Sequence, residues 1–254
     1  MNILIVLVAA LLPAILLWIY IWKLDPQPEP TNWLLKAVFY GVVIFIPVGI
    51  LESAIKQVLF GGEPTTIYGT TVMAFFVAAI PEESFKLLAL WLVLRKNPYF
   101  DEHFDGIVYA VCVGLGFAAV ENVLYLIGSQ DNWLSVAIGR TLMAVPGHYA
   151  FGVLMGYYYS VYHFVDHSPR TAACVLLVPV LAHGVYDTLA LSGLVDTAIG
   201  SIAFIILIYF CIKMHKFAKK KIIAQIEREM EIIIHNHFLH PKNNNFSPII
   251  VEHE

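Results

Sequence analysis

The sequence contains few charged residues and only three cysteines, none of them close to another. Of its 254 residues only 13% are Asp, Glu, Lys or Arg, whereas 59% are hydrophobic and the mean hydropathy is +0.74. A soluble domain of this length is far more polar, so the composition excludes that class. The three cysteines, Cys112, Cys174 and Cys211, stand singly in apolar stretches without CxxC spacing. This pattern argues against a disulfide framework and against a thiolate metal site.

The first apolar run lacks the features of a cleavable signal peptide. The run has no basic leading region and no persuasive small-residue cleavage site, so we expect an uncleaved helix rather than a signal peptide. The formal net charge of −4 is small and says little about partners. We expect the lipid bilayer as a partner and no nucleic acid.

The sequence does contain a series of apolar runs that are long enough to cross a bilayer. A crossing helix needs about 20 residues, which gives this chain room for seven or eight. We therefore predict an all-α fold, a polytopic membrane bundle of about seven transmembrane helices. The Pro146-Gly147 pair leaves open whether the fifth span is one kinked helix or a helix plus a re-entrant half. The predicted spans are Ile3–Trp22, Trp33–Leu51, Ile67–Leu94, Gly106–Gly128, Trp133–Phe164, Arg170–Leu191 and Leu194–Ile212.

Basic residues predict the orientation of the bundle. Five lysines follow the last span, and such a cluster is typical of a cytoplasmic end. With seven spans the N-terminus then lies outside, in a multi-pass protein of the cell membrane. We predict a transmembrane domain at 1–212 and, at 213–254, a cytoplasmic basic amphipathic helix and tail. The helix over 213–234 lies on anionic lipid or pairs with another helix, and a flexible tail is expected from His235 onward.

Four polar clusters lie within the predicted spans. A charged side chain near the middle of a bilayer costs about 2.5–3.5 kcal/mol, so its repetition on several spans favours a functional site. At about 1.5 Å of rise per residue, all four clusters lie roughly 18–24 Å from the cytoplasmic surface. We therefore expect them to meet around one hydrated pocket. The clusters are Glu82-Glu83 with Lys86, Glu121-Asn122, His148 with Gly152, and His183 with Asp187.

Helical spacing predicts how these side chains pair. Glu82 and Lys86 are four residues apart and share a helix face, which leaves Glu83 free to point elsewhere. His183 and Asp187 share a face in the same way, so the carboxylate can orient the imidazole. Gly152 clears space one turn from His148. Taken singly, each cluster also fits a structural ion pair or an interhelical hydrogen bond, and the common depth is what favours a site.

The series EExxK, FxxxEN, HxxxG and HxxxD, in this order over residues 82–187, resembles the PrsW family of bacterial intramembrane proteases. That family belongs to the wider superfamily of the CAAX prenyl endopeptidases. The resemblance implies a helical membrane endopeptidase with a metalloprotease classification. It also implies a single-span membrane protein as substrate, typified by an anti-sigma factor cut near the extracytoplasmic side in stress signalling.

Peptide hydrolysis needs an activated water, a stabilised oxyanion and a proton for the leaving amine. No Ser-His-Asp or catalytic cysteine arrangement is apparent, which leaves activation by a carboxylate or by a metal. Glu82 or Glu83 is the expected general base. The predicted catalytic residues are Glu82, Glu83, Glu121, Asn122, His148 and His183, with Lys86 and Asp187 in support.

Two routes to the activated water stay open. In the first, His148, His183 and Glu121 hold one divalent ion, for which zinc is the leading choice. In the second, which the absence of an HExxH motif keeps open, a glutamate activates water without metal while His and Asn side chains stabilise the oxyanion. The alternative to a protease is a transporter or an ion- or proton-conducting protein. Transporters often contain internal repeats, and the two halves of this chain show no convincing correspondence.

Overall fold

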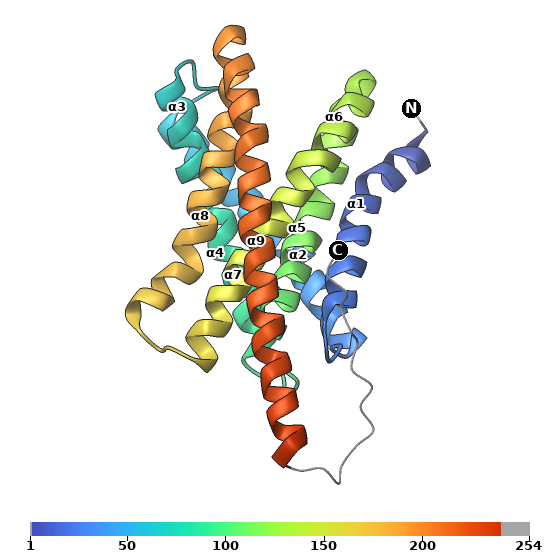
Figure 1. The fold of residues 1–254 in the computed structure, drawn as a ribbon. Helices are drawn as coiled ribbons and strands as arrows, with labels where there is room; N and C mark the ends of the chain where they lie inside the picture. Colours follow the sequence, from blue (N-terminus) through green and yellow to red (C-terminus); the bar gives the residue numbers. More distant parts are fainter. Residues whose placement is uncertain (1, 240–254) are drawn as a thin grey trace.

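The computed structural model describes residues 2–239, and within this part every regular element is a helix (Figure 1). Five helices are long and apolar enough to cross a membrane. Two further helical runs, 67–94 and 133–164, complete the bundle. The prediction of an all-α membrane bundle is therefore confirmed. The elements are α1 (Ile3–Leu24), α2 (Thr31–Leu59), α3 (Ile67–Val72), η1 (Met73–Ala79), α4 (Ile80–Leu94), α5 (Asp105–Gly128), η2 (Gln130–Asn132), α6 (Trp133–Gly139), η3 (Arg140–Ala144), α7 (Val145–Phe164), α8 (Pro169–Leu191), η4 (Ser192–Leu194) and α9 (Thr197–Leu239).

Two stretches of π-helix, η1 and η3, precede prolines of the bundle. Pro81 follows η1 in the first turn of α4, and Pro146 follows η3 in the first turn of α7. Proline has no N–H to donate and its ring clashes with the carbonyl four residues earlier, so a local widening of the helix accommodates it. The run over 133–164 is consequently one continuous helical segment rather than a helix plus a re-entrant half. Both stretches of π-helix lie next to predicted site residues.

Helix α2 extends to Leu59, well beyond its predicted end at Leu51. The polar residues of 52–59 predicted a connection, and for these residues that prediction is wrong. Polar side chains do not end a helix by themselves, because backbone hydrogen bonds continue past them and no glycine or proline intervenes before Gly61. Glu52 thereby becomes part of a helix of the bundle.

Helix α9 continues from the last span through the basic segment without a break (Figure 1). Its extension packs against the rest of the chain, since Ala218, Ile222, Gln225 and Glu229 are buried. Pairing with other helices, one of the two predicted arrangements, is therefore observed. The prediction of a flexible tail from His235 is wrong for residues 235–239, which are helical. The remainder, 240–254, lies outside the described residues.

Glycines bring α2, α5 and α7 into backbone contact. A Cβ added to Gly41 would lie 2.1 Å from the carbonyl oxygen of Val113, and one added to Gly116 would lie 2.3 Å from that of Val38. A Cβ on Gly156 would meet the carbonyl oxygen of Gly106 at 2.1 Å. Small residues at such positions are typical of membrane helix packing. These contacts surround α5 closely and fix its height against its neighbours.

Candidate active site

The predicted site residues from α4, α5, α7 and α8 meet inside the bundle. The central side chains are 0–6% exposed, and each one contacts at least one other member of the group. The expected convergence of the four clusters is therefore observed. Ionised groups at such burial need partners, and the contacts below supply them. The central residues are Glu82, Glu83, Lys86, His148 and His183.

Lys86 is the centre of this group. Its ammonium nitrogen lies 2.8 Å from Glu82 Oε2, 2.8 Å from Glu83 Oε1 and 3.2 Å from His148 Nδ1. The predicted Glu82–Lys86 pair is confirmed, whereas the prediction that Glu83 is free of the lysine is wrong. Residues three apart on a helix are neighbours as well as residues four apart, so one lysine reaches both acids.

His183 lies between two carboxylates. Its Nδ1 is 2.9 Å from Glu83 Oε1, and its Nε2 is 3.2 Å from Asp187 Oδ2, which confirms the predicted His183–Asp187 pair. Ionised carboxylates only accept hydrogen bonds, so with both carboxylates ionised each ring nitrogen carries a proton. The ring also stacks on Phe151, with centroids 4.7 Å apart. This arrangement fixes the position and the orientation of the imidazole.

His148 connects the lysine to the acid of α5. Its Nε2 lies 2.8 Å from Glu121 Oε2. Because the Lys86 ammonium can only donate, Nδ1 is the acceptor and Nε2 carries the proton that Glu121 accepts. The space cleared by Gly152 is taken by α5, since an added Cβ would lie 3.0 Å from Val111 Cα. The glycine thus allows the close approach of α7 to α5.

Asn122 lies beside this group, and its amide is engaged in contacts between helices. Its Nδ2 donates to the carbonyl oxygen of Ala10 at 2.8 Å, and its Oδ1 accepts from Arg140 Nε at 2.5 Å. The amide therefore joins α5 to α1 and to η3. A role of Asn122 as an oxyanion donor stays a prediction.

Arg140 is a site residue that the sequence interpretation missed. Its Nη2 lies 2.9 Å from Glu121 Oε2, and its guanidinium lies over the ring of Tyr125 at 4.2 Å. The available signal was a lone arginine inside a predicted span, which is as costly in lipid as the four clusters. Glu121 therefore has two partners, an arginine and a histidine, on the same oxygen.

Glu52 is a second residue that was missed. One of its carboxylate oxygens, Oε1, is buried without a hydrogen-bond partner. Its charge interacts with Glu82, Glu121 and Lys86. Because residues 52–59 were predicted to form a connection, Glu52 was not considered as a site residue, although it lies in α2 near the group.

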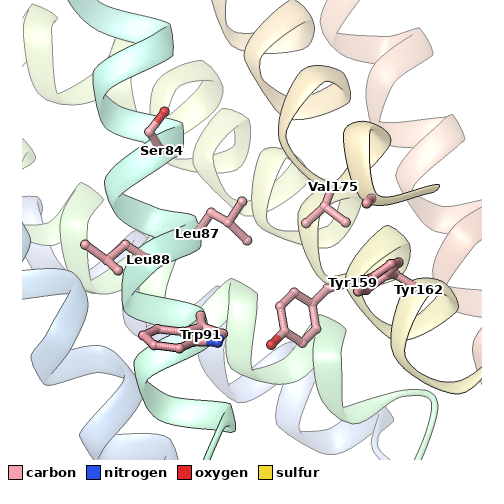
Figure 2. A pocket seen from close by; sticks show the side chains of 8 residues that line it. Ser84, Leu87, Leu88, Trp91, Tyr159, Tyr162 and Val175 are labelled. Atoms are coloured by element: carbon pink, nitrogen blue, oxygen red, sulfur yellow. The ribbon is translucent and has the colours of Figure 1, made fainter. Parts of the chain in front are cut away.

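The central side chains pack against one another, and the hydrated pocket around them stays a prediction. Contact with the exterior is greatest at Glu121 and Asp187, whose side chains are 16% and 20% exposed. A shallow open pocket of about 410 Å³ lies between α4, α7 and α8 (Figure 2), and its lining does not include the five central residues. Its lining begins at Ser84, next to Glu83 in α4, and continues along Leu87 and Trp91.

The donor set of the group fits a metal ion. Glu82, Glu83 and His183 each offer a ligand atom within 4.8 Å of the others. Glu83 Oε2 is buried without a hydrogen-bond partner, so it is free to act as a ligand. Carboxylate oxygens and imidazole nitrogens are ligands that zinc accepts in proteins. In the predicted set, His148 and Glu121 bind each other, and the set of Glu121, His148 and His183 stays a prediction.

The comparisons with known proteins agree with this geometry. A family model described as PrsW family intramembrane metalloprotease matches residues 29–213. Protease PrsW of Bacillus subtilis (strain 168) is 35% identical over 182 residues, which cover 70% of this chain and 79% of the relative. Protease PrsW of Oceanobacillus iheyensis is 33% identical over 183 residues, covering 72% and 81%.

A third relative, Protease PrsW of Clostridioides difficile (strain 630), is 35% identical over 164 residues, covering 63% of this chain and 67% of the relative. No solved structure matched the chain. The family match includes every predicted site residue between 82 and 187. The family is described as acting within the membrane, and the bundle has five helices that are long and apolar enough to cross one. The chain belongs to the PrsW family of intramembrane metalloproteases.

Proposed function

We propose that this protease hydrolyses a peptide bond of a single-span membrane protein, such as an anti-sigma factor, with water activated at Glu82, Glu83 and His183. The observation that carries the proposal is the single network that joins acids, imidazoles and a lysine from four helices inside an apolar bundle. So many ionisable groups in a membrane interior are expensive, and their convergence supports a catalytic use.

Glu83 is the best-placed general base. Its Oε1 is held by Lys86 and His183, which favours the ionised form, while Oε2 has no partner and is free to accept a proton from water. Glu82 shares the same lysine at Oε2 and is the second candidate. A base needs both a fixed position and a free acceptor atom, and Glu83 combines them.

In the metal route, which is the alternative to Glu83 as the base, Glu82, Glu83 and His183 would hold the divalent ion, with zinc as the proposed metal, and Glu83 is then a ligand. When bound, such an ion supplies a more acidic water and polarises the substrate carbonyl. For His183 to become a ligand its Nδ1 must lose the proton directed at Glu83, whereas Asp187 retains its contact with Nε2 and keeps the ring oriented. The set of Glu121, His148 and His183 is the second assignment.

The remaining groups supply positive charge and protons. Lys86 and the Nε2–H of His148 lie beside the carboxylates and would stabilise an oxyanion that forms there. The proton taken by Glu83 is the one that the leaving amine needs, so the same carboxyl can return it. We further propose a location in the cell membrane with the N-terminus outside and the C-terminus cytoplasmic.

Cleavage of a single-span reporter by the purified full chain in lipid vesicles tests the proposal. Glu83→Gln and His183→Ala should abolish the product band, because they remove the base and the ring between the two carboxylates. Glu63→Gln is the matched control, since Glu63 is exposed and pairs only with Lys56 outside the group. Membrane insertion and the melting temperature of each variant report folding.

The proposal is overturned if Glu82→Ala, Glu83→Ala, His148→Ala and His183→Ala all cleave as the wild type does. Metal dependence is tested on the active wild type by chelation. Loss of cleavage together with stoichiometric loss of zinc, and recovery when zinc is restored, supports the metal route. Full cleavage by metal-free protein supports activation by glutamate alone.

A further inference from the structure

A second group of acids lies where α1 ends and α5 begins, away from the motifs of the proposed active site. Asp25 caps α1, and Glu29 lies in the connection to α2. Asp101 and Glu102 lie in the connection before α5, and Asp105 begins α5. Glu229, from the extension of α9, accepts a hydrogen bond from the backbone N–H of His103 in the same connection. Segments far apart in the sequence thus bring six carboxyl groups together.

Three of these acids are spaced as cation ligands. Glu29, Asp101 and Asp105 each offer a carboxylate oxygen, and these oxygens all lie within 4.8 Å of one another. Ca²⁺, Mg²⁺ and Mn²⁺ prefer oxygen ligands and commonly bind carboxylates. One ion between the three oxygens would contact all of them after small side-chain movements.

No ion pair described within residues 2–239 offsets this charge. Within this part of the chain, none of the six carboxylates forms an ion pair, in which a side-chain nitrogen lies within 4.0 Å of a carboxylate oxygen. Their hydrogen bonds come from neutral donors, such as the Tyr109 hydroxyl to Glu29 and the backbone N–H groups of residues 101 and 102 to Asp105 Oδ2. Neutral donors do not cancel the net charge of the group.

Buried oxygens without partners are a separate observation that points to a missing ligand. Asp105 is 0% exposed, and no N–H or O–H donor among the described residues reaches its Oδ1; its carboxyl lies against that of Glu29, a second acid. Asp25 is 1% exposed and its Oδ2 has no such donor either. A buried polar atom left without a partner costs about 1–3 kcal/mol, and more when it is charged. A cation between Glu29, Asp101 and Asp105 would satisfy the Asp105 oxygen and offset the charge of the group.

The same groups are electrostatically unfavourable as they stand. Asp25 and Asp105 are buried beside other acids, so water cannot hydrate their ionised forms and no ion pair described within residues 2–239 neutralises them. Two states relieve this: a bound cation, or protons held by some of the carboxyls. The packing of Glu229 and of the connections against one another favours a ligand that contacts several chain segments at once.

We propose that Glu29, Asp101 and Asp105 bind a divalent cation that prefers oxygen ligands, such as Ca²⁺, Mg²⁺ or Mn²⁺. The ion joins the α1–α2 connection to the start of α5 and stabilises the surface on which the α9 extension packs. The site uses no residue of the proposed active site, and it does not depend on the proposed reaction.

Titration of the purified full chain with Mn²⁺, followed by paramagnetic resonance of the free ion, tests the proposal. The measurement is made in the His183→Ala background, so that binding at the proposed active site does not contribute. We expect one equivalent of bound Mn²⁺, displaced by Ca²⁺ or Mg²⁺. Asp101→Asn should weaken the binding by at least about tenfold, because it removes one charged ligand. Asp101 is exposed, so this variant does not disturb the core.

Asp196→Asn is the matched control, because Asp196 is an exposed acid that accepts a hydrogen bond near the start of α9. It should bind Mn²⁺ as the parent does. A rise in melting temperature with Ca²⁺ or Mg²⁺, at constant ionic strength, should occur in the parent and disappear in Asp101→Asn. Absence of Mn²⁺ binding in the parent, or equal binding in Asp101→Asn, overturns the proposal and leaves shared protons as the explanation.

Discussion

The bundle contains two buried groups of acids that differ in what offsets their charge. In the group within the membrane, Glu82 and Glu83 share Lys86, and Glu121 binds both Arg140 and His148. In the group around Asp105, only neutral donors reach the carboxylates among the described residues. A buried charge is tolerated when an opposite charge pairs with it, whereas buried carboxylates without such a partner need a proton or a cation from solution. The comparison therefore separates a group whose charges are paired with side chains of the bundle from a group of acids without such ion pairs within residues 2–239.

The largest expected effect breaks the pairing in the first group. Lys86→Met leaves Glu82 and Glu83 buried without their ammonium, which should lower the free energy of unfolding by about 3–5 kcal/mol and abolish cleavage. Lys56→Met is the matched control, because the Lys56–Glu63 pair is exposed and such pairs contribute about 0–1 kcal/mol. Denaturation of both variants in detergent measures the difference. Equal stabilities would show that the lysine does not compensate the two acids.

The next effect tests the helix contact that supports both groups. A methyl group at residue 116 would lie 2.3 Å from the Val38 carbonyl oxygen, so Gly116→Ala should destabilise the protein by about 1–3 kcal/mol. Gly49→Ala is the control, since nothing lies within 4 Å of its added Cβ, and it should be neutral or stabilising by up to about 1 kcal/mol. Melting temperatures report both. An unchanged melting temperature in Gly116→Ala would contradict the close α2–α5 contact.

A smaller effect tests whether Arg140 positions Glu121 in the first group. Arg140→Lys keeps one positive charge near Glu121 but cannot also reach Asn122 in the same planar geometry, so we expect kcat/KM to fall about tenfold. The kcat/KM of Arg140→Gln should fall further, because the positive charge is lost as well. Arg95→Gln is the control, as Arg95 also lies over an aromatic ring, that of Trp91. If Arg140→Gln cleaves like the wild type, Arg140 does not position Glu121.

The smallest expected effect is a change in the free energy of unfolding, and it has opposite signs in the two groups. With divalent ions chelated, Asp105→Asn should raise the free energy of unfolding by about 1 kcal/mol, because a neutral amide needs neither a cation nor a bound proton while its oxygen can still accept the backbone hydrogen bonds. Asp187→Asn should lower it, because Asp187 pairs with His183. Thermal unfolding in chelator compares the two. A loss of stability in both variants would remove the distinction between the groups.

Local patterns predicted the first group and not the second. Glu82 with Lys86 and His183 with Asp187 are four residues apart, so helical periodicity alone places them on one face. The common depth of the four clusters followed from residue counts within apolar runs. Asp25, Asp105 and Glu229 share no such period, and they meet only because two connections and the α9 extension pack together. Arg140 and Glu52 were missed because each stood alone in its own stretch.

The ends and interruptions of the helices were less predictable than their existence. Pro146 left a broken helix open, yet a stretch of π-helix before it lets the helical run continue, as another does before Pro81. The polar residues after Leu51 suggested a connection, yet backbone hydrogen bonding continues to Leu59. Apolar length decides that a segment is a helix in lipid, whereas its end lies where backbone hydrogen bonding stops, which in α2 is past the polar residues at 52–59.

The sequence by itself determined that this protein is a helical membrane bundle with four motifs at a common depth, because hydropathy and helical spacing are local properties. Only the tertiary structure decided which charges meet. Glu83 binds His183 across 100 positions, Asn122 binds the backbone of α1, and Glu121 shares its oxygen between two helical segments. These pairings depend on how closely the helices approach at their glycines and on how burial forces each charge to find a partner, and both are properties of the packed bundle.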